Sequence, residues 1–275
     1  MDLNTIAEVV RPPPEPPATQ WRDGDAWLAG GTWLFSVPQP GLRRLVDLTA
    51  LGWDAVTVAE DGVHIGATCT IRQLYETAPQ SHWPAFALAR TSCEAFLSSF
   101  KVWNAATVGG NICLSLPAGP MITLSVALEA TYTLCAPDGT ERTVAAADFV
   151  TGDNRNILAS GELLRSIHLP AEALRKRHAH RRFSLTRLGR STVFLAATRT
   201  PATTDLLLTI TAGTTRPMRL AFDSMPDAAT LRDRLDDLPG DVWFEDPNGT
   251  ADHRRHLTRY FAEQMRVELA EEDRP

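Results

Sequence analysis

The chain has 275 residues, of which 44% are hydrophobic and 22% are charged, and its net charge is −6 with a pI near 5.7. Such a composition is typical of a globular protein that buries a core in one large domain or two smaller ones. The negative net charge argues against a nucleic-acid-binding protein, which needs a basic surface. No stretch reaches the roughly 18 consecutive apolar residues that a membrane helix needs.

The first predicted elements are short strands behind a proline-rich segment. Residues 11–17 read RPPPEPP, and because proline blocks helix and donates no hydrogen bond, we expect an extended spacer there. Apolar runs predict strands at 26–30, 44–48 and 62–67. The last of these follows the turn dipeptide Asp61-Gly62.

Helical patterns follow in the next part of the chain. Thr70 is the predicted cap of a first helix, and residues 83–97 place apolar side chains near helical spacing. Pro120 suits the first position of a third helix. The apolar side of that helix, which we interpret as core, consists of Met121, Leu124 and Leu128.

The second half of the chain contains mostly strand patterns. A hairpin is predicted at 130–144 and a strand at 162–170, which Pro170 ends. The basic run Arg175–His180 is predicted to be a solvated linker between two domains. Beyond it we expect strands at 181–188, 192–200 and 205–213 and helices near 226–237 and 251–271. This order predicts an α+β protein with two lobes.

Two glycine pairs are the main candidates for a binding site. Gly30-Gly31-Thr32 and Gly109-Gly110-Asn111 each lie between short apolar runs, and Thr107 precedes the second pair. Adjacent glycines let backbone amides converge into a concavity that binds anions, because no Cβ blocks the approach. The pattern is neither a P-loop nor G-x-G-x-x-G. It leaves two interpretations open, namely two tight turns or two loops that together hold a diphosphate.

The cysteines argue against a metal or cluster site on this chain. Cys69, Cys93, Cys113 and Cys135 include no C-x-x-C pair, the spacing typical of iron–sulfur and zinc ligands. We expect reduced, mostly buried thiols. The N-terminal residues lack the basic segment and apolar run of a secretory signal, so we expect a cytoplasmic protein.

No catalytic side chain is predicted. Asp47, Asp148 and Glu162 lie by predicted strand ends, where structural or solvated roles are expected. The histidines show no ligand spacing, so we expect no metal site. A bound cofactor would then carry the chemistry, and the protein would hold and tune it.

The segments around the glycine pairs resemble a known family. LAGGTWLFS (28–36) and FKVWNAATVGGNI (100–112) are similar to the two flavin loops of the medium, FAD-binding subunits of molybdenum hydroxylases. Stretches in the same order as in that family are RLVDL, DGVHIGATCTIRQL, ERTVAAADFVTG, GELLRSIHLP, RRFSLTRLGR, ITAGTTRPMRL and DHRRHLTRYFAEQM. The similarity extends over nearly the whole chain and is most specific at the paired loops.

The resemblance implies a fold and a function. The fold is a PCMH-type FAD-binding lobe at 1–172, with two α/β subdomains at about 1–52 and 53–172, and a smaller C-terminal domain at 180–275 with an antiparallel sheet and helices. The function is that of an FAD-dependent oxidoreductase subunit. It would receive electrons from a small [2Fe–2S] partner subunit, next to a large molybdenum-cofactor subunit, and pass them to an acceptor such as NAD or a quinone.

The resemblance also implies cofactor-binding residues. The first loop would wrap the FAD diphosphate with Leu28, Ala29, Gly30, Gly31, Thr32, Trp33 and Leu34. The second loop would complete the cradle with Thr107, Val108, Gly109, Gly110 and Asn111. Leu164 would pack near the flavin ring, and Arg187 would keep a cation near the cofactor.

Some positions depart from the family pattern. Trp33 replaces an acidic or small polar residue, and we expect it to pack in the core, with stacking on the cofactor or a neighbouring helix as the alternatives. Pro120 replaces an aspartate that helps to hold the flavin, Trp103 a basic residue and Asp153 an aromatic one. These changes leave two other functions open, a stand-alone FAD-dependent oxidoreductase of small molecules and a scaffold that has lost flavin.

Overall fold

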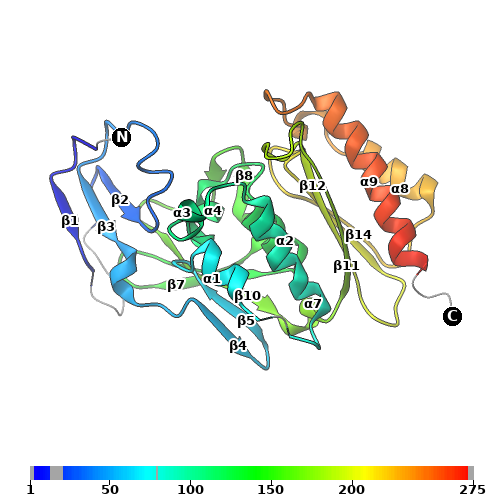
Figure 1. Cartoon of the computed structure of the whole chain (residues 1–275), viewed down its shortest axis with the longest axis horizontal. Helices are drawn as coiled ribbons and strands as arrows, with labels where there is room; N and C mark the ends of the chain where they lie inside the picture. Colours follow the sequence, from blue (N-terminus) through cyan, green and yellow to red (C-terminus); the bar gives the residue numbers. More distant parts are fainter. Residues whose placement is uncertain (1–2, 13–20, 79, 272–275) are drawn as a thin grey trace.

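Three main β-sheets follow one another along the chain (Figure 1). The computed structural model describes residues 3–12, 21–78 and 80–271. Most of the predicted proline-rich spacer lies outside these residues. The mixture of helices and strands confirms the predicted α+β class. Within the described ranges, none of the helices is both long enough and apolar enough to cross a bilayer.

The first sheet is parallel and contains the strand that leads into the first glycine pair. Its strands are β1 (Glu8–Val10), β2 (Asp25–Leu28) and β3 (Arg44–Asp47), with β3 in the centre. The strands predicted at 26–30 and 44–48 correspond to β2 and β3 and are confirmed. A short helical turn, η1 (Leu48–Leu51), follows β3, and the side chain of Asp47 accepts a hydrogen bond from the amide of Thr49 there.

An ion pair connects β2 to β3 at the start of both strands. Nε of Arg44 donates to Oδ1 of Asp25 at 2.8 Å, and the side chains are only 9% and 1% exposed. The hydrogen bond from Arg44 holds the pKa of Asp25 below its usual value. In the unfolded chain the pKa of this carboxyl is near 3.9. Since the pKa is lower in the folded chain, folding favours the ionised form.

This shift predicts acid sensitivity of the N-terminal sheet. The contribution of the pair is complete above the unfolded pKa and is lost as the pH falls through the lower folded pKa. We expect Asp25→Asn to reduce the stability near neutral pH and to flatten the fall of the Tm below about pH 5. Differential scanning calorimetry against pH measures this. If the Tm of wild type and variant fell by the same amount as the pH is lowered, the result would contradict this prediction.

The second sheet is antiparallel. Its strands, in spatial order, are β4 (Val56–Ala59), β5 (Gly62–Gly66), β10 (Leu163–Pro170), β6 (Thr131–Cys135) and β7 (Glu141–Ala145). Strands β5, β6 and β10 contribute buried side chains to the hydrophobic core of this part of the chain. Alternate residues of β5 and β10, such as Ile65 and Ile167, point into the core, and the residues between them are half-buried. The predicted strands and the predicted hairpin are confirmed, and β4 was not predicted.

Short helices follow β5 in the chain. They are α1 (Ile71–Glu76), α2 (Ala87–Ala95), α3 (Phe100–Trp103), α4 (Val108–Leu114) and α5 (Pro120–Ala127), with η2 (Pro84–Phe86) before α2. One of them, α4, packs directly on β5 and β10. Thr70 caps α1 as predicted, in a reciprocal capping box with Gln73. Pro120 begins α5 as predicted, but α5 is buried on all sides, and its contacts include α2, α4, β12 and β13. The remaining small elements of this region are α6 (Ala146–Phe149), β8 (Val150–Gly152), β9 (Arg155–Asn156) and α7 (Ala171–Leu174).

The third sheet is a four-stranded antiparallel meander at the C-terminal side. Its strands are β11 (Arg177–Phe183), β12 (Val193–Arg199), β13 (Leu206–Thr211) and β14 (Met218–Phe222). Helices α8 (Ala228–Asp236) and α9 (Ala251–Glu271) lie on one side of it, with the turn η3 (Gly240–Val242) between them in the chain (Figure 1). Because α5 contacts β12 and β13 as well, every residue of these two strands is buried.

The structure corrects the prediction for the basic run. Residues 177–180 are not a solvated linker, because they form the first half of β11 and pair with β12, and Ala179 is buried. The rings of His178 and His180 stack at 6.3 Å on the same side of the strand. The strand predicted at 181–188 is shorter than expected and ends at Phe183. The loop that follows reaches the site described below.

Candidate functional site

The first glycine pair opens a single helical turn whose leading amides have no partner among the described residues. Phe35 donates its amide to the carbonyl of Gly31 at 2.8 Å, and Ser36 donates to the carbonyl of Trp33 at 2.8 Å. Gly31 has a φ of +67°, a conformation that favours glycine. In the described part of the chain, no group accepts a hydrogen bond from the amides of Thr32, Trp33 or Leu34. These amides are available to an anionic ligand.

The second glycine pair uses its amides within the protein. The amide of Val108 donates to the carbonyl of Cys69 at 2.8 Å, and that of Gly109 donates to the carbonyl of Ala67 at 3.0 Å. The amide of Gly110 donates to Oγ1 of Thr107, the N-cap of α4, at 3.0 Å. The expectation of free amide donors in both loops is therefore corrected, because the second pair provides close packing and a wall rather than donors.

The two glycine loops touch each other. A Cβ on Gly30 would lie 1.7 Å from the carbonyl oxygen of Ala105, which is far inside van der Waals contact. A Cβ on Gly109 would lie 2.6 Å from the Cβ of Ala67. Glycine is required at both positions because backbone approaches backbone there. Segments that are 75 residues apart in the sequence, Gly30 and Ala105, thus form one surface.

A cavity of about 670 Å³ lies along this surface, within the range of roughly 300–1,000 Å³ that is typical of small-molecule sites. The predicted residues that line it are Leu28, Ala29, Gly30, Gly31, Thr32, Trp33, Leu34, Thr107, Gly110 and Asn111. The structure therefore brings the first loop and one face of the second loop together around one space.

Four predicted residues do not line the cavity. Val108 and Gly109 are buried, and Gly109 packs against Ala67. Leu164 is buried in β10, and its backbone lies beside the thiol of Cys113, a residue that lines the cavity. Arg187 is exposed in the loop after β11, and Arg190, three residues later, lines the cavity instead.

The charges of the cavity favour an anion. Among its described lining residues there is no carboxylate and no histidine, and Arg190 supplies a positive charge. Nη1 of Arg190 lies 3.8 Å from Oδ2 of Asp246, which also forms an ion pair with the buried Arg254. Burial raises the pKa of Cys113 to about 12, so this thiol stays neutral. The cavity thus combines free amides, one cation and apolar walls.

Two of the four departures from the family pattern, Trp33 and Pro120, line this cavity, whereas Trp103 and Asp153 do not. Trp33 is 46% exposed and lines it, so the expectation that Trp33 packs in the core is wrong. Pro120 also lines it, at the start of α5. There the amide of Met121 donates a hydrogen bond to Oδ1 of Asn111 at 3.0 Å. Trp103 does not line the cavity, and its indole donates to the carbonyl of Phe96 at 3.0 Å.

Sequence reasoning missed three further segments of the lining. They are residues 95–98 at the end of α2, residues 116, 118 and 119 before α5, and residues 188, 190 and 191 before β12. None of them contains a glycine pair, although Leu188 and Arg190 lie at the end of the stretch RRFSLTRLGR that resembles the family. They reach the cavity only because α2, α5 and β12 pack together, and this packing leaves no local signal in the sequence.

Comparison with known families identifies the fold of this site. The family described as "FAD binding domain in molybdopterin dehydrogenase" matches residues 19–172, which contain both glycine loops. The chain belongs to this family. The resemblance to this family and the FAD cofactor predicted from the sequence are thereby confirmed.

Curated relatives of this FAD-binding family are similar over part of the chain. The putative xanthine dehydrogenase FAD-binding subunit XdhB of Escherichia coli is 34% identical over 140 residues, which is 50% of this chain and 46% of that subunit. The xanthine dehydrogenase of rice is 34% identical over 119 residues, which is 41% of this chain and 9% of that enzyme. The matched part therefore spans less than half the length of these relatives.

Solved structures match the fold over the full chain. A carbon monoxide dehydrogenase chain from Oligotropha carboxidovorans has a TM-score of 0.80 and 20% identity, with 98% of each chain covered. A quinoline 2-oxidoreductase chain from Pseudomonas putida has a TM-score of 0.76 and 18% identity, also with 98% of each chain covered. At these identities the similarity establishes the fold.

Proposed function

We propose that this chain is the FAD-binding electron-transfer subunit of a molybdenum hydroxylase-type complex. It would receive electrons from a small subunit with [2Fe–2S] clusters, while a large subunit with a molybdenum cofactor oxidises the substrate. The FAD would then pass the electrons to an external acceptor such as NAD or a quinone. The observation that carries this proposal is the cavity at the two touching glycine loops of a chain that belongs to the FAD-binding family.

The residues of the cavity fit a dinucleotide with a diphosphate bridge. The amides of Thr32, Trp33 and Leu34 have no partner in the described chain and would hold the diphosphate oxygens. Arg190 would add a positive charge from the C-terminal side. The exposed indole of Trp33 offers a flat apolar surface for a ring. When bound, FAD can exchange single electrons and electron pairs, which suits a link between clusters and a two-electron acceptor.

The side chains of the cavity support electron transfer rather than substrate chemistry. A flavoenzyme that oxidises a small molecule by itself usually needs a group to move a proton. The described lining residues include no histidine and no carboxylate, and the Cys113 thiol is held neutral by its raised pKa. The roles that we propose for these residues are to bind the cofactor, to orient it and to exclude water from it.

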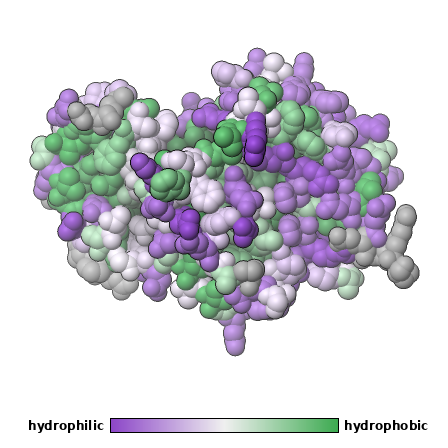
Figure 2. Space-filling view, viewed as in Figure 1, coloured by the Kyte–Doolittle hydropathy of each residue, from purple (hydrophilic) through white to green (hydrophobic). Residues whose placement is uncertain are grey.

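Exposed hydrophobic side chains near the cavity support a partner subunit. Trp33 is 46% and Leu188 is 79% exposed, and both line the cavity. Hydrophobic surface gathers over the N-terminal part of the molecule, whereas the surface around α8 and α9 is more hydrophilic (Figure 2). A partner chain would cover this hydrophobic surface. The compartment that we propose is the cytoplasm, since all four cysteines are free thiols.

The proposed function predicts a yellow protein that depends on partners for turnover. We expect purified protein to show the visible absorption bands of oxidised flavin and to release FAD, identified by mass, on heating. Co-expression with the partner subunits should yield a complex with molybdenum and iron in which substrate reduces the flavin. A colourless protein would instead indicate a scaffold without flavin. Reduction of the isolated chain by a small substrate would indicate a stand-alone oxidoreductase.

A further inference from the structure

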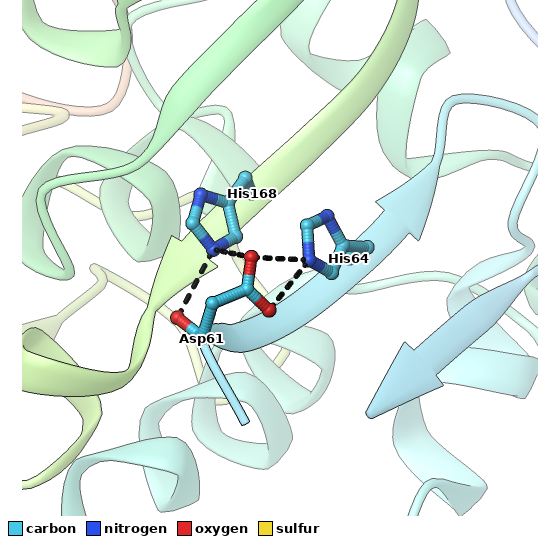
Figure 3. Close-up of side chains that lie close together, drawn as sticks. All are labelled: Asp61, His64 and His168. Carbon is cyan, nitrogen blue, oxygen red and sulfur yellow. Dashed lines mark hydrogen bonds and ion pairs between the residues drawn. The ribbon is translucent and has the colours of Figure 1, made fainter. Parts of the chain in front are cut away.

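Three side chains with metal-binding atoms converge on the outer face of the second sheet (Figure 3). Asp61 lies in the turn between β4 and β5, His64 lies on β5, and His168 lies on β10. His64 and His168 are directly opposite each other in the antiparallel register. None of the three lines the FAD cavity.

The donor atoms point toward one another. Nε2 of His64 lies 3.1 Å from each carboxylate oxygen of Asp61. Nε2 of His168 lies 3.6 Å from Oδ2 of Asp61 and 3.2 Å from its backbone carbonyl oxygen. The two imidazole rings stack at 4.4 Å, and one ligand atom from each of the three residues lies within 4.8 Å of the others. Zinc–ligand bonds of about 2.0–2.2 Å place neighbouring ligand atoms at similar separations, so small rotations complete a site.

The backbone holds Asp61 in position without a ligand. The amide of Ala171 donates to the carbonyl of Asp61 at 2.8 Å. Gly62 has a φ of +144°, and a Cβ there would lie 2.0 Å from the carbonyl oxygen of Leu169, so the turn is packed directly against β10. Such rigid support from strands is what a metal site requires.

The three side chains are accessible to an ion from solvent. The side chain of Asp61 is 61% exposed, that of His64 is 41% exposed and that of His168 is 29% exposed. At such exposure an ion pair contributes little to stability. The strand neighbours across from the histidines are uncharged, since His64 pairs with Thr57 and His168 pairs with Thr131. No cation on these paired positions opposes a metal ion.

We propose that Asp61, His64 and His168 bind a divalent transition-metal ion, with Zn²⁺ as the favoured occupant. Two imidazole nitrogens and one carboxylate oxygen are ligands that Zn²⁺ accepts, and solvent supplies the remaining position. The ion would connect the turn at Asp61 to β10. It is separate from the flavin chemistry, and the expectation that the histidines contribute no metal site is revised by this proposal.

Zinc titration of tag-free, metal-free protein tests the proposal. Isothermal titration calorimetry with ZnCl₂ should show one ion per chain, and zinc at about 100 times its dissociation constant should raise the Tm by about 5–10 °C. His64→Asn and His168→Asn should each weaken binding at least about tenfold. His82→Asn, which removes an exposed histidine from another loop, is the matched control and should leave binding unchanged.

Two results would overturn the proposal. One is the absence of zinc binding to wild-type protein at micromolar to millimolar concentrations. The other is undiminished binding to the triple variant Asp61→Asn, His64→Asn, His168→Asn. Titration with Co²⁺ distinguishes binding at the histidines from binding at a cysteine, because a thiolate charge-transfer band would assign the ion to a cysteine. The FAD content of all variants should equal that of wild type, so failure of this proposal is distinguishable from failure of the proposed function.

Discussion

Gly30→Ala is expected to cause the largest loss of FAD. The added Cβ would lie 1.7 Å from the carbonyl oxygen of Ala105, and a backbone oxygen cannot rotate away as a side chain can. The two glycine loops must separate, and overpacking of this kind costs about 1–3 kcal/mol. If this cost falls on the bound state, affinity for FAD decreases roughly 5- to 150-fold. The ratio of flavin to protein after gel filtration measures the effect.

Gly41→Ala is the matched control for this variant. A Cβ on Gly41 would have no neighbour within 4 Å, and the residue lies between β2 and β3, in the same part of the chain as Gly30. We expect full FAD content in this control. Circular dichroism should show that both variants are folded. If folded Gly30→Ala retained as much FAD as Gly41→Ala, the contact between the loops would not be needed for binding.

Arg254→Met is expected to cause the largest loss of stability. The side chain of Arg254 is 1% exposed, and its guanidinium donates to the carbonyls of Gly249 at 3.1 Å and Thr192 at 2.9 Å. It also donates to the carbonyl of Ala212 and forms an ion pair with Asp246. Removal of the cation leaves a partly buried carboxylate and these carbonyls without their donor. Breaking such a pair costs about 3–5 kcal/mol, which lowers the Tm by about 6–20 °C in a domain of this size.

Arg259→Met provides the comparison on the same helix. Arg259 forms an ion pair with Asp236, and these side chains are 40% and 38% exposed. Exposed pairs of this kind contribute at most about 1 kcal/mol, so we expect only a small change in Tm. Thermal denaturation followed by circular dichroism distinguishes the variants. Equal Tm values for Arg254→Met and Arg259→Met would refute the stabilising role of the buried network.

Loss of Arg254 should also disturb the position of Arg190 at the cavity. Asp246 lies between Arg254 and Arg190, and Arg190 lines the cavity. The C-terminal region therefore supports the position of a charge at the cavity. Residues beyond the matched segment 19–172 thus line the cavity together with the glycine loops.

Local sequence patterns predicted most of the secondary structure. Thr70 caps α1 because its hydroxyl accepts an amide that the first turn leaves without a partner, a contact that needs only neighbouring residues. Pro120 begins α5 for a similar local reason, since its missing N–H is not needed there. The prediction of a linker at the basic run was wrong because residues 177–180 pair with β12 and so form a strand. This pairing partner lies elsewhere in the sequence, so no pattern within the run itself indicates it.

The sequence by itself determined the family, the FAD cofactor and the positions where glycine is required. Glycine pairs and family motifs are local, and they are readable without coordinates. Only the tertiary structure decided which groups line the cavity. The amides of Val108 and Gly109 were predicted as donors, but they are used by Cys69 and Ala67. Arg190 rather than Arg187 lines the cavity, and His64 meets His168 across two strands. Such contacts depend on how distant segments pack, and the sequence around each residue carries no record of that packing.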